Sequence, residues 1–241
     1  MRYFLGMEVA KSRKGISVLQ RKYIHDLLSK TCMLGCKPSD TPIDAGRKPE
    51  NIGKSVEKER YRRLVGKLIY LSHTRPNIAF SVSVVSQHMH LPKQTHMEAV
   101  YKILRYMKGS SGKGLFFKKN ERKEVEIFTD ANWAGSTEDR RSITGYCSYI
   151  WGNLVTWRSK KQNVVAKSSA KAKFRAMAQE ICEGLKGGNS HWQKRQERKQ
   201  IQPPRSKGLR TKVGNGLVKT SANQWHERTR RSFTIPVVIL S

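Results

Sequence analysis

Asp130 is the acidic residue whose position best suits metal-dependent chemistry. It closes the strand-like run of residues 125–130, and an acid at a strand end lies at the lip of a sheet. A two-metal site that hydrolyses a phosphodiester needs several carboxylates converging from different elements, because each Mg²⁺ takes hard oxygen ligands. Asp130 alone cannot build such a site, and an isolated Asp at a strand end also serves as a turn or cap residue. The surrounding sequence must decide between the two interpretations.

The net charge indicates a polyanionic partner. The 241 residues include 48 Lys and Arg against 18 Asp and Glu, a formal charge of +30. Binding to RNA or DNA releases counterions and gains affinity without any specific contact. The last 56 residues hold 13 basic and 2 acidic side chains, and the preceding part is also basic. We therefore expect contact with nucleic acid, and a basic tail with no evolved role is the alternative.

The four cysteines and the absence of targeting signals predict an intracellular protein, cytoplasmic or nuclear and not secreted. No basic and apolar leader opens the sequence, and no apolar run reaches the roughly 18 residues that span a bilayer. Cys32 and Cys36 have no second Cys or His pair at zinc-ligand spacing. Ordinary reduced thiols are therefore expected rather than a zinc site or disulfides, and no contact with a membrane is expected.

The first half of the sequence predicts a strand pair followed by helices. Residues 3–9 and 16–19 form a hairpin pattern around turn residues 11–15, and a lone hairpin needs a partner sheet or helix. Apolar stripes at helical spacing then predict four helices, over residues 20–33, 61–69, 76–85 and 95–107. Pro76 suits the first turn of the third helix, and Thr95 with Glu98 matches a capping box that opens the fourth.

After Gly109 the hydrophobic pattern changes to short strands, at residues 114–118, 125–130, 143–151 and 154–157. Gly152 and Asn153 predict a tight hairpin between the last two. A helix from Ser168 or Ser169 to Gly184 follows, with an apolar face made of Phe174, Met177, Ile181 and Leu185. From Lys186 the sequence is polar, charged and aperiodic, which predicts disorder.

The expected fold class is α+β, with a helical segment followed by an α/β layer and a disordered basic tail. The predicted divisions are a hairpin at residues 1–19, a helical segment at 20–112, an α/β domain at 113–185 and a tail at 186–241.

The order of several motifs resembles the Pol polyprotein of copia-type LTR retrotransposons. One group, similar to the ribonuclease H domain, comprises residues 129–135 (TDANWAG), 139–146 (DRRSITGY), 157–162 (WRSKKQ) and 168–176 (SSAKAKFRA). An upstream group, similar to the C-terminal part of the reverse transcriptase, comprises residues 3–9 (YFLGMEV), 36–42 (CKPSDTP), 61–71 (YRRLVGKLIYL), 74–78 (TRPNI) and 104–109 (LRYMKG). The resemblance covers roughly residues 3–185 in the family's order.

The resemblance implies a role for each segment. Residues 1–19 would be a primer-grip-like hairpin left from the reverse transcriptase palm, and residues 20–112 the thumb and connection. Residues 113–185 would be a truncated ribonuclease H domain, which in the family cuts the RNA of an RNA–DNA hybrid with Mg²⁺. The implied partners are the hybrid, RNA or DNA, and the missing upstream palm. Candidate contacts to the nucleic-acid backbone are Arg62, Arg63, Arg75, Lys102, Arg105, Lys108, Arg140, Arg141, Lys160 and Lys161.

Departures from the family pattern predict a loss of activity. The family's polymerase aspartates belong to a Tyr-x-Asp-Asp turn, and this sequence contains no such turn. Asp130 matches the first nuclease acid, but Lys171 and Lys173 occupy the positions of two family glutamates. Lys173 is the better match for the catalytic one, because an aromatic residue and an alanine follow it in a similar way. No Asp occurs after Asp139, so the family's later aspartates are missing. We expect Asp130 alone not to hold Mg²⁺.

The sequence thus predicts a fragment of a copia-type Pol polyprotein, derived from the machinery that copies RNA into DNA and cuts the RNA of the hybrid. As encoded, it is expected to be catalytically inactive. A non-catalytic, basic nucleic-acid-binding protein is the alternative, and residual nuclease activity through Asp130 is a weaker third. The abrupt change of composition at Lys186 is interpreted as a shifted reading frame or a misjoined exon.

Overall fold

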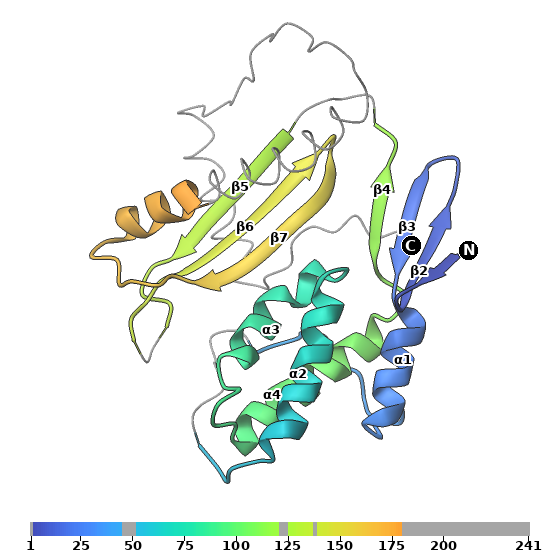
Figure 1. The fold of residues 1–241 in the computed structure, drawn as a ribbon, viewed down its shortest axis with the longest axis horizontal. Helices are drawn as coiled ribbons and strands as arrows, with labels where there is room; N and C mark the ends of the chain where they lie inside the picture. Colours follow the sequence, from blue (N-terminus) through green and yellow to red (C-terminus); the bar gives the residue numbers. More distant parts are fainter. Residues whose placement is uncertain (1, 45–51, 121–124, 137–138, 180–241) are drawn as a thin grey trace, which may run out of the picture. The chain divides into compact units, whose positions relative to one another are not determined.

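The N-terminal sheet combines the start of the chain with a strand from beyond the helices. In the computed structural model, which describes residues 2–44, 52–120, 125–136 and 139–179, it has the order β1-β2-β3-β4 (Figure 1). The strands are β1 (Arg2–Phe4), β2 (Met7–Lys11), β3 (Gly15–Leu19) and β4 (Leu115–Lys118), and neighbours are antiparallel. The strand expected over residues 3–9 is broken at Leu5 and Gly6, where φ is 47° and 76°.

The pairing of β4 with β3 corrects the predicted domain boundary. Residues 114–118 were assigned to the ribonuclease H-like segment, but β4 instead supplies the partner that the N-terminal hairpin needs. Glycines permit the close approach of the two strands. A Cβ at Gly15 would lie 2.2 Å from the carbonyl oxygen of Phe117, and one at Gly114 would lie 2.3 Å from that of Val18. A larger residue at either position would therefore disturb the pairing of β3 with β4.

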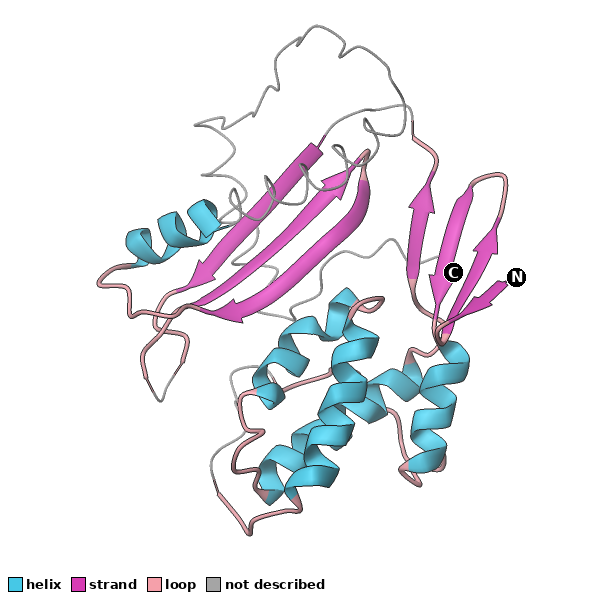
Figure 2. Ribbon diagram, viewed as in Figure 1, coloured by secondary structure: helices cyan, strands magenta, loops and turns pink. Residues whose placement is uncertain are grey.

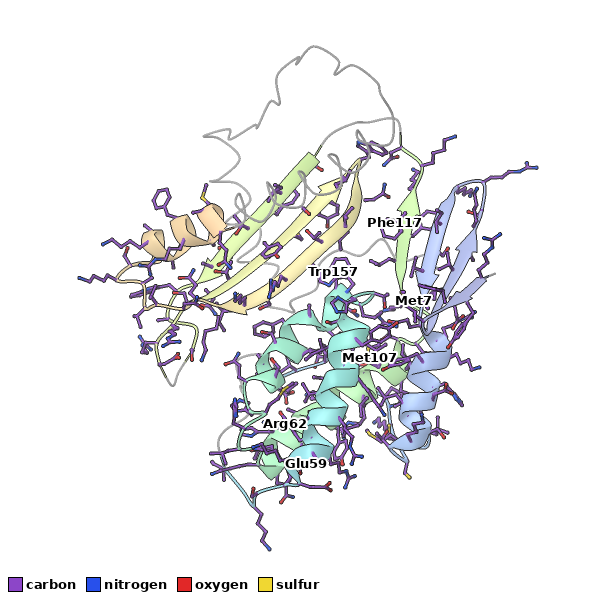
Figure 3. All side chains as sticks on the ribbon, viewed as in Figure 1. Met7, Glu59, Arg62, Met107, Phe117 and Trp157 are labelled. Carbon is purple, nitrogen blue, oxygen red and sulfur yellow. The ribbon has the colours of Figure 1, made fainter. Side chains whose placement is uncertain are left out.

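The helical segment contains the main core. The predicted helices are confirmed, with shifted ends, as α1 (Arg21–Lys30), α2 (Lys58–Ser72), a short 3₁₀ turn η1 (Pro76–Ile78), α3 (Ala79–Ser86) and α4 (Gln94–Gly109). Figure 2 shows these helices grouped in one bundle. Their apolar stripes meet in a cluster that includes Ile24, Leu68 and Val100, and Met107 projects into it (Figure 3). This cluster anchors α2 and α4, which carry half of the candidate basic residues.

The first turn of α4 is capped by a residue other than those predicted. The backbone N–H of Lys93 donates to Nδ1 of His96 over 3.0 Å, so His96 takes the role expected of Glu98. Thr95 donates instead to the carbonyl oxygen of Ile52. The capping box lies two residues before the predicted one, at Lys93 and His96. A histidine can fill this position because a neutral imidazole accepts a hydrogen bond as a carboxylate does.

A second sheet follows, made of β5 (Val125–Asn132), β6 (Ile143–Ile150) and β7 (Asn153–Lys161) in that order. Neighbouring strands run in opposite directions (Figure 1). The turn between β6 and β7 is centred on Trp151 and Gly152, whose φ angles of 55° and 71° are both positive, as a tight hairpin turn requires. The predicted hairpin is confirmed, one residue earlier than expected.

The last described element is a helix over residues 169–179, and its predicted start is confirmed. Ser168 Oγ accepts the backbone N–H of Lys171 over 3.2 Å, which satisfies one of the open donors of the first turn. The predicted apolar face is wrong. Ala172 and Ala176 are buried, whereas Phe174 is 70% exposed. Ile181, Leu185 and the predicted disordered tail lie outside the described residues.

The chain divides into two compact units. Among described residues, the first contains residues 2–127 and 147–159 without the gaps noted above, and the second contains residues 128–146 and 160–179 with its own gap. None of the described helices is long and apolar enough to cross a membrane. No disulfide joins the described cysteines, which are Cys32, Cys36 and Cys147.

Candidate nuclease and nucleic-acid site

Asp130 lies near the end of β5, beside a contact between that strand and the helix over residues 169–179. The next residue, Ala131, belongs to a small buried cluster with Ala166, Ala172 and Ala176. Four small side chains allow the helix backbone to approach the strand closely. The strand that carries the candidate acid and the helix on which the next acid is expected are therefore packed together.

A buried amide strengthens this contact. Gln162 Nε2 donates to the carbonyl oxygen of Ala172 over 2.9 Å and to Thr144 Oγ1 over 3.0 Å. Gln162 is 6% exposed, so it links the start of the helix to β6 inside the protein. At the other side, Trp133 Nε1 donates to the carbonyl oxygen of Ala166 over 2.8 Å, which fixes the loop before the helix. The scaffold of the candidate site is thus well ordered by side-chain contacts.

The residues on this scaffold do not suit Mg²⁺. Lys171 and Lys173 flank the buried Ala172, and both are exposed. Within the described part of the chain, no group of three or more His, Cys, Asp or Glu is arranged to hold a metal ion. Asp130 would supply one carboxylate, and lysine ammonium groups cannot act as oxygen ligands for a divalent cation. The described residues at this site therefore do not form a metal-binding group.

The second acid of the region, Asp139, is already bound to cations. Its carboxylate lies 3.1 Å from Lys161 Nζ and 3.4 Å from Arg141 Nε. The pKa of Asp139 is lowered to about 2, first by a hydrogen bond from Ser136 and then by the contacts with Lys161 and Arg141. Asp139 is therefore a fully ionised partner for two of the candidate nucleic-acid contacts, and these two cations are partly neutralised.

Arg75 must be removed from the candidate nucleic-acid contacts. It is 1% exposed, and its guanidinium donates to Ser110 O over 2.8 Å, to Ser110 Oγ over 2.6 Å and to Lys113 O over 3.1 Å. Burial lowers the pKa of Arg75 to about 10. The sequence could not separate this arginine from the exposed ones, because the acceptors that bury it are backbone carbonyls far along the chain.

Two further lysines hold the loop that precedes α2. Lys102 forms an ion pair with Asp44, and Lys108 Nζ donates to the carbonyl oxygen of Cys36 over 2.6 Å. Both lysines belong to α4, so they attach residues 36–44 to the helical bundle. Their charges remain near the surface, but their ammonium groups already have partners.

The remaining candidates are the more accessible ones. They are Arg62, Arg63, Arg105, Arg140 and Lys160, of which Arg105 is half-buried and the others are exposed. Arg62 is an exposed residue of α2 (Figure 3), and its Nε donates to the carbonyl oxygen of Met89 over 3.1 Å. Arg63 is 3.9 Å from Glu57, and both side chains are largely exposed, which makes a weak pair. These side chains can still face a phosphate.

Sequence reasoning treated Lys171 and Lys173 only as lost ligands and missed the surface that they form. Both are exposed on the helix that also exposes Phe174, and Arg175 beside them is exposed too. The signal was present in the pattern of the sequence, because alanines at positions 172 and 176 lie one helical turn apart and mark the buried face.

Comparison with known proteins shows the family. A segment of 182 residues, 73% of this chain, is 37% identical to an uncharacterized mitochondrial protein of Arabidopsis thaliana and covers 74% of that protein. A segment of 180 residues, 74% of this chain, is 39% identical to the retrovirus-related Pol polyprotein from transposon RE1 of the same plant. The Pol polyprotein from transposon TNT 1-94 of Nicotiana tabacum is 35% identical over 181 residues, 70% of this chain. The homologues of this chain include retrovirus-related Pol polyproteins of transposons.

The predicted origin from a transposon Pol polyprotein is therefore confirmed. The chain matches 12% of the length of the RE1 Pol polyprotein and 14% of that of TNT 1-94, so it corresponds to a small part of each. No protein-family model and no solved structure matches the chain.

Proposed function

We propose that this Pol-derived chain comes from the region of a copia-type polyprotein that joins the C-terminal part of the reverse transcriptase to the ribonuclease H domain. As encoded, it binds nucleic acid and does not cut it. The order of the motifs from residue 3 to residue 176 supports the copia-type origin. The likeness to transposon Pol polyproteins over about three quarters of the chain supports the same origin at a coarser level.

The loss of cleavage rests on one observation. The helix that packs against the strand of Asp130 exposes Lys171 and Lys173 and contributes no carboxylate in its described part. Hydrolysis of a phosphodiester by the two-metal route needs carboxylates from several elements to hold both ions. A lysine in place of a glutamate removes an oxygen donor, so the single carboxylate of Asp130 is insufficient.

Binding is supported by charge that remains available on the surface. The chain carries +30; Arg62, Arg63, Arg140 and Lys160 are exposed, and Arg105 is half-buried. Each phosphate that a cation neutralises makes the slope of log K against log salt steeper, by about 0.9 for duplex DNA. Contacts of this kind give affinity for RNA, DNA or a hybrid without sequence preference.

Cleavage is tested with purified protein and an RNA–DNA hybrid labelled on its RNA strand, in buffer with Mg²⁺. We expect no product from the wild-type chain. Asp130→Asn provides the decisive comparison, and Asp26→Asn makes the same chemical change at an exposed acid on α1. Cleavage by the wild-type and Asp26→Asn proteins that disappears in Asp130→Asn would overturn the proposed inactivity.

Binding is tested on the same hybrid by fluorescence anisotropy over a series of salt concentrations. We expect affinity that falls steeply with salt, and a slope reduced by about 2 when Arg62 and Arg63 are both changed to Gln. Absence of measurable affinity at about 100 mM salt, where proteins with several phosphate contacts still bind, would refute the binding function.

A further inference from the structure

Phe174 occupies an unusual position for a large apolar side chain. It is 70% exposed on a helix whose buried side is marked by Ala172 and Ala176, at 0% and 1%. Successive residues are separated by about 100° around a helix, so position 174 lies opposite the middle of that buried side. Phe174 therefore points outward from the unit that contains it.

Several basic residues lie close to Phe174 in the sequence, on the same helix or just before it. Lys171 and Lys173 flank the outward face, and Lys167 precedes the helix; all three are exposed. No Asp or Glu occurs between residues 140 and 179. Lys167, Lys171, Lys173 and Arg175 thus lie in a stretch of the sequence whose nearest acids are Asp139 on one side and Glu180 on the other.

Arg175 defines one edge of the surface. Its Nη1 donates to the carbonyl oxygen of Val165 over 3.3 Å, which holds the loop before the helix against the helix flank. Val164 and Val165 are about half exposed, at 51% and 52%. The surface therefore combines one protruding aromatic ring, a small aliphatic border and several exposed lysine side chains.

This combination fits single-stranded nucleic acid better than other polyanions. A single-stranded chain offers both phosphates and unstacked bases, and base stacking on an aromatic side chain contributes together with backbone cations. A duplex keeps its bases stacked on each other and cannot cover Phe174 in this way. A membrane-binding helix needs a wide apolar face, whereas the outward neighbours of Phe174 include the small residues Ala170 and Ala178.

We propose that Phe174, Lys171 and Lys173 form a contact site for single-stranded DNA or RNA, with a base stacked on the ring and phosphates bound by the lysines. The site rests on the proposed nucleic-acid binding and specifies where and how one part of it occurs. The same lysines that remove the metal-binding character of the helix give it affinity for the phosphate backbone. With glutamates at these two positions the helix would supply ligands for a metal ion. With lysines it can bind the phosphate oxygens of a nucleic acid directly.

The experiment compares variants of the full chain for binding to a fluorescent 20-nucleotide oligothymidylate and to an RNA–DNA hybrid of the same length. Phe174→Leu should weaken binding to the single strand about tenfold, in the range expected for loss of one stacked base, and leave binding to the hybrid within twofold. Phe4→Leu is the matched control, because Phe4 is also exposed, at 64%, but lies on β1. It should change neither affinity.

The lysines are tested with Lys171→Gln combined with Lys173→Gln, against Lys118→Gln combined with Lys119→Gln. Both double variants lose two exposed positive charges, but the control pair lies at the end of β4. The first pair should weaken single-strand binding at least threefold more than the second. Equal effects of the two pairs would mean that only net charge matters and would overturn the site.

The outcomes separate this site from the general function. Wild-type protein that binds neither nucleic acid refutes the proposed function and the site together. If the wild-type protein binds the single strand and Phe174→Leu binds it equally tightly, the site is refuted but the proposed function is not. Retention on anionic phosphatidylserine vesicles that requires Phe174, with unchanged oligothymidylate binding, would assign the surface to lipid and also overturn the proposal.

Discussion

The stability of the helical bundle should fall in mild acid because of His96. This side chain is fully buried, its Nδ1 accepts the N–H of Lys93, and its ring stacks on His88 with centroids 3.7 Å apart. Its Nε2 is buried without a hydrogen-bond partner. A second proton would destroy the acceptor at Nδ1 and place a charge at the positive end of the α4 dipole. Among the described residues, no carboxylate forms an ion pair with this ring. All of these effects favour the neutral ring.

The magnitude follows from the pKa. Burial, followed by the charges of His88 and Lys93, lowers the pKa of His96 from 6.5 to about 4. The unfolded chain binds the proton more readily between these two values, so stability is complete above pH 6.5 and declines as the pH falls toward 4. A shift of this size corresponds to about 3 kcal/mol in total, of which roughly 2 kcal/mol is lost by pH 5.

The assay is urea denaturation followed by circular dichroism at several pH values from 7.5 to 4.5. His96→Gln is the informative variant, because glutamine at this third helical position can also accept the N–H of the capping residue but does not titrate. We expect the wild-type midpoint to fall by on the order of 1 M between pH 7.5 and 5, and the variant to lose much less. His73→Gln, at an exposed histidine just after α2, is the control. Identical pH dependence in wild type and His96→Gln would refute the reasoning.

Three other substitutions test the packing. Arg75→Ala should destabilise the bundle by about 3 kcal/mol or more, because the carbonyl of Ser110 and other buried acceptors lose their donor; a variant that unfolds at the wild-type urea concentration would show that water replaces the guanidinium. Gly15→Ala should destabilise the N-terminal sheet by roughly 2 kcal/mol, because its Cβ would meet the carbonyl of Phe117 at 2.2 Å; an unchanged melting temperature would contradict this close approach. Gly66→Ala should have the opposite sign, about 0.5–1 kcal/mol of stabilisation, because this exposed position in α2 has open space around it and alanine favours the helix; lower stability would indicate a contact at that surface.

Local patterns predicted the elements well because helices and hairpins are determined by residues close in sequence. The stripe from Tyr61 to Ile69 and the glycine turn at Gly152 each needed only neighbouring positions, and both elements were found where expected. The partner of β3 depended on a strand almost one hundred residues later. Its place in the sequence suggested that β4 belongs to the next domain. The residues of a strand do not themselves show whether it pairs with an earlier or a later strand, and β4 pairs with the earlier β3.

The candidate site divides in the same way. Asp130 and the two lysines could be selected from motif and spacing, but accessibility could not. Arg75 and Arg62 looked equivalent in the sequence. In the structure Arg75 is buried and donates to backbone carbonyl oxygens, whereas Arg62 is exposed on α2. Phe174 was assigned to the core because large apolar residues are usually buried, and the small residues that actually pack were overlooked.

The alanine contact and the two lysines together explain how a helix can keep its place in the fold while its chemistry changes. Ala172 and Ala176 face the strand of Asp130, and Gln162 fixes the backbone of the same turn. Lys171 and Lys173 point away from this contact and are exposed, so replacing an acid by a lysine there disturbs no packing. Surface substitutions of this kind usually change stability by less than about 0.5 kcal/mol. The packing that positions the helix therefore does not depend on the charge of the side chains at positions 171 and 173. The acidic side chains of a catalytic site can be lost while the helix keeps its place.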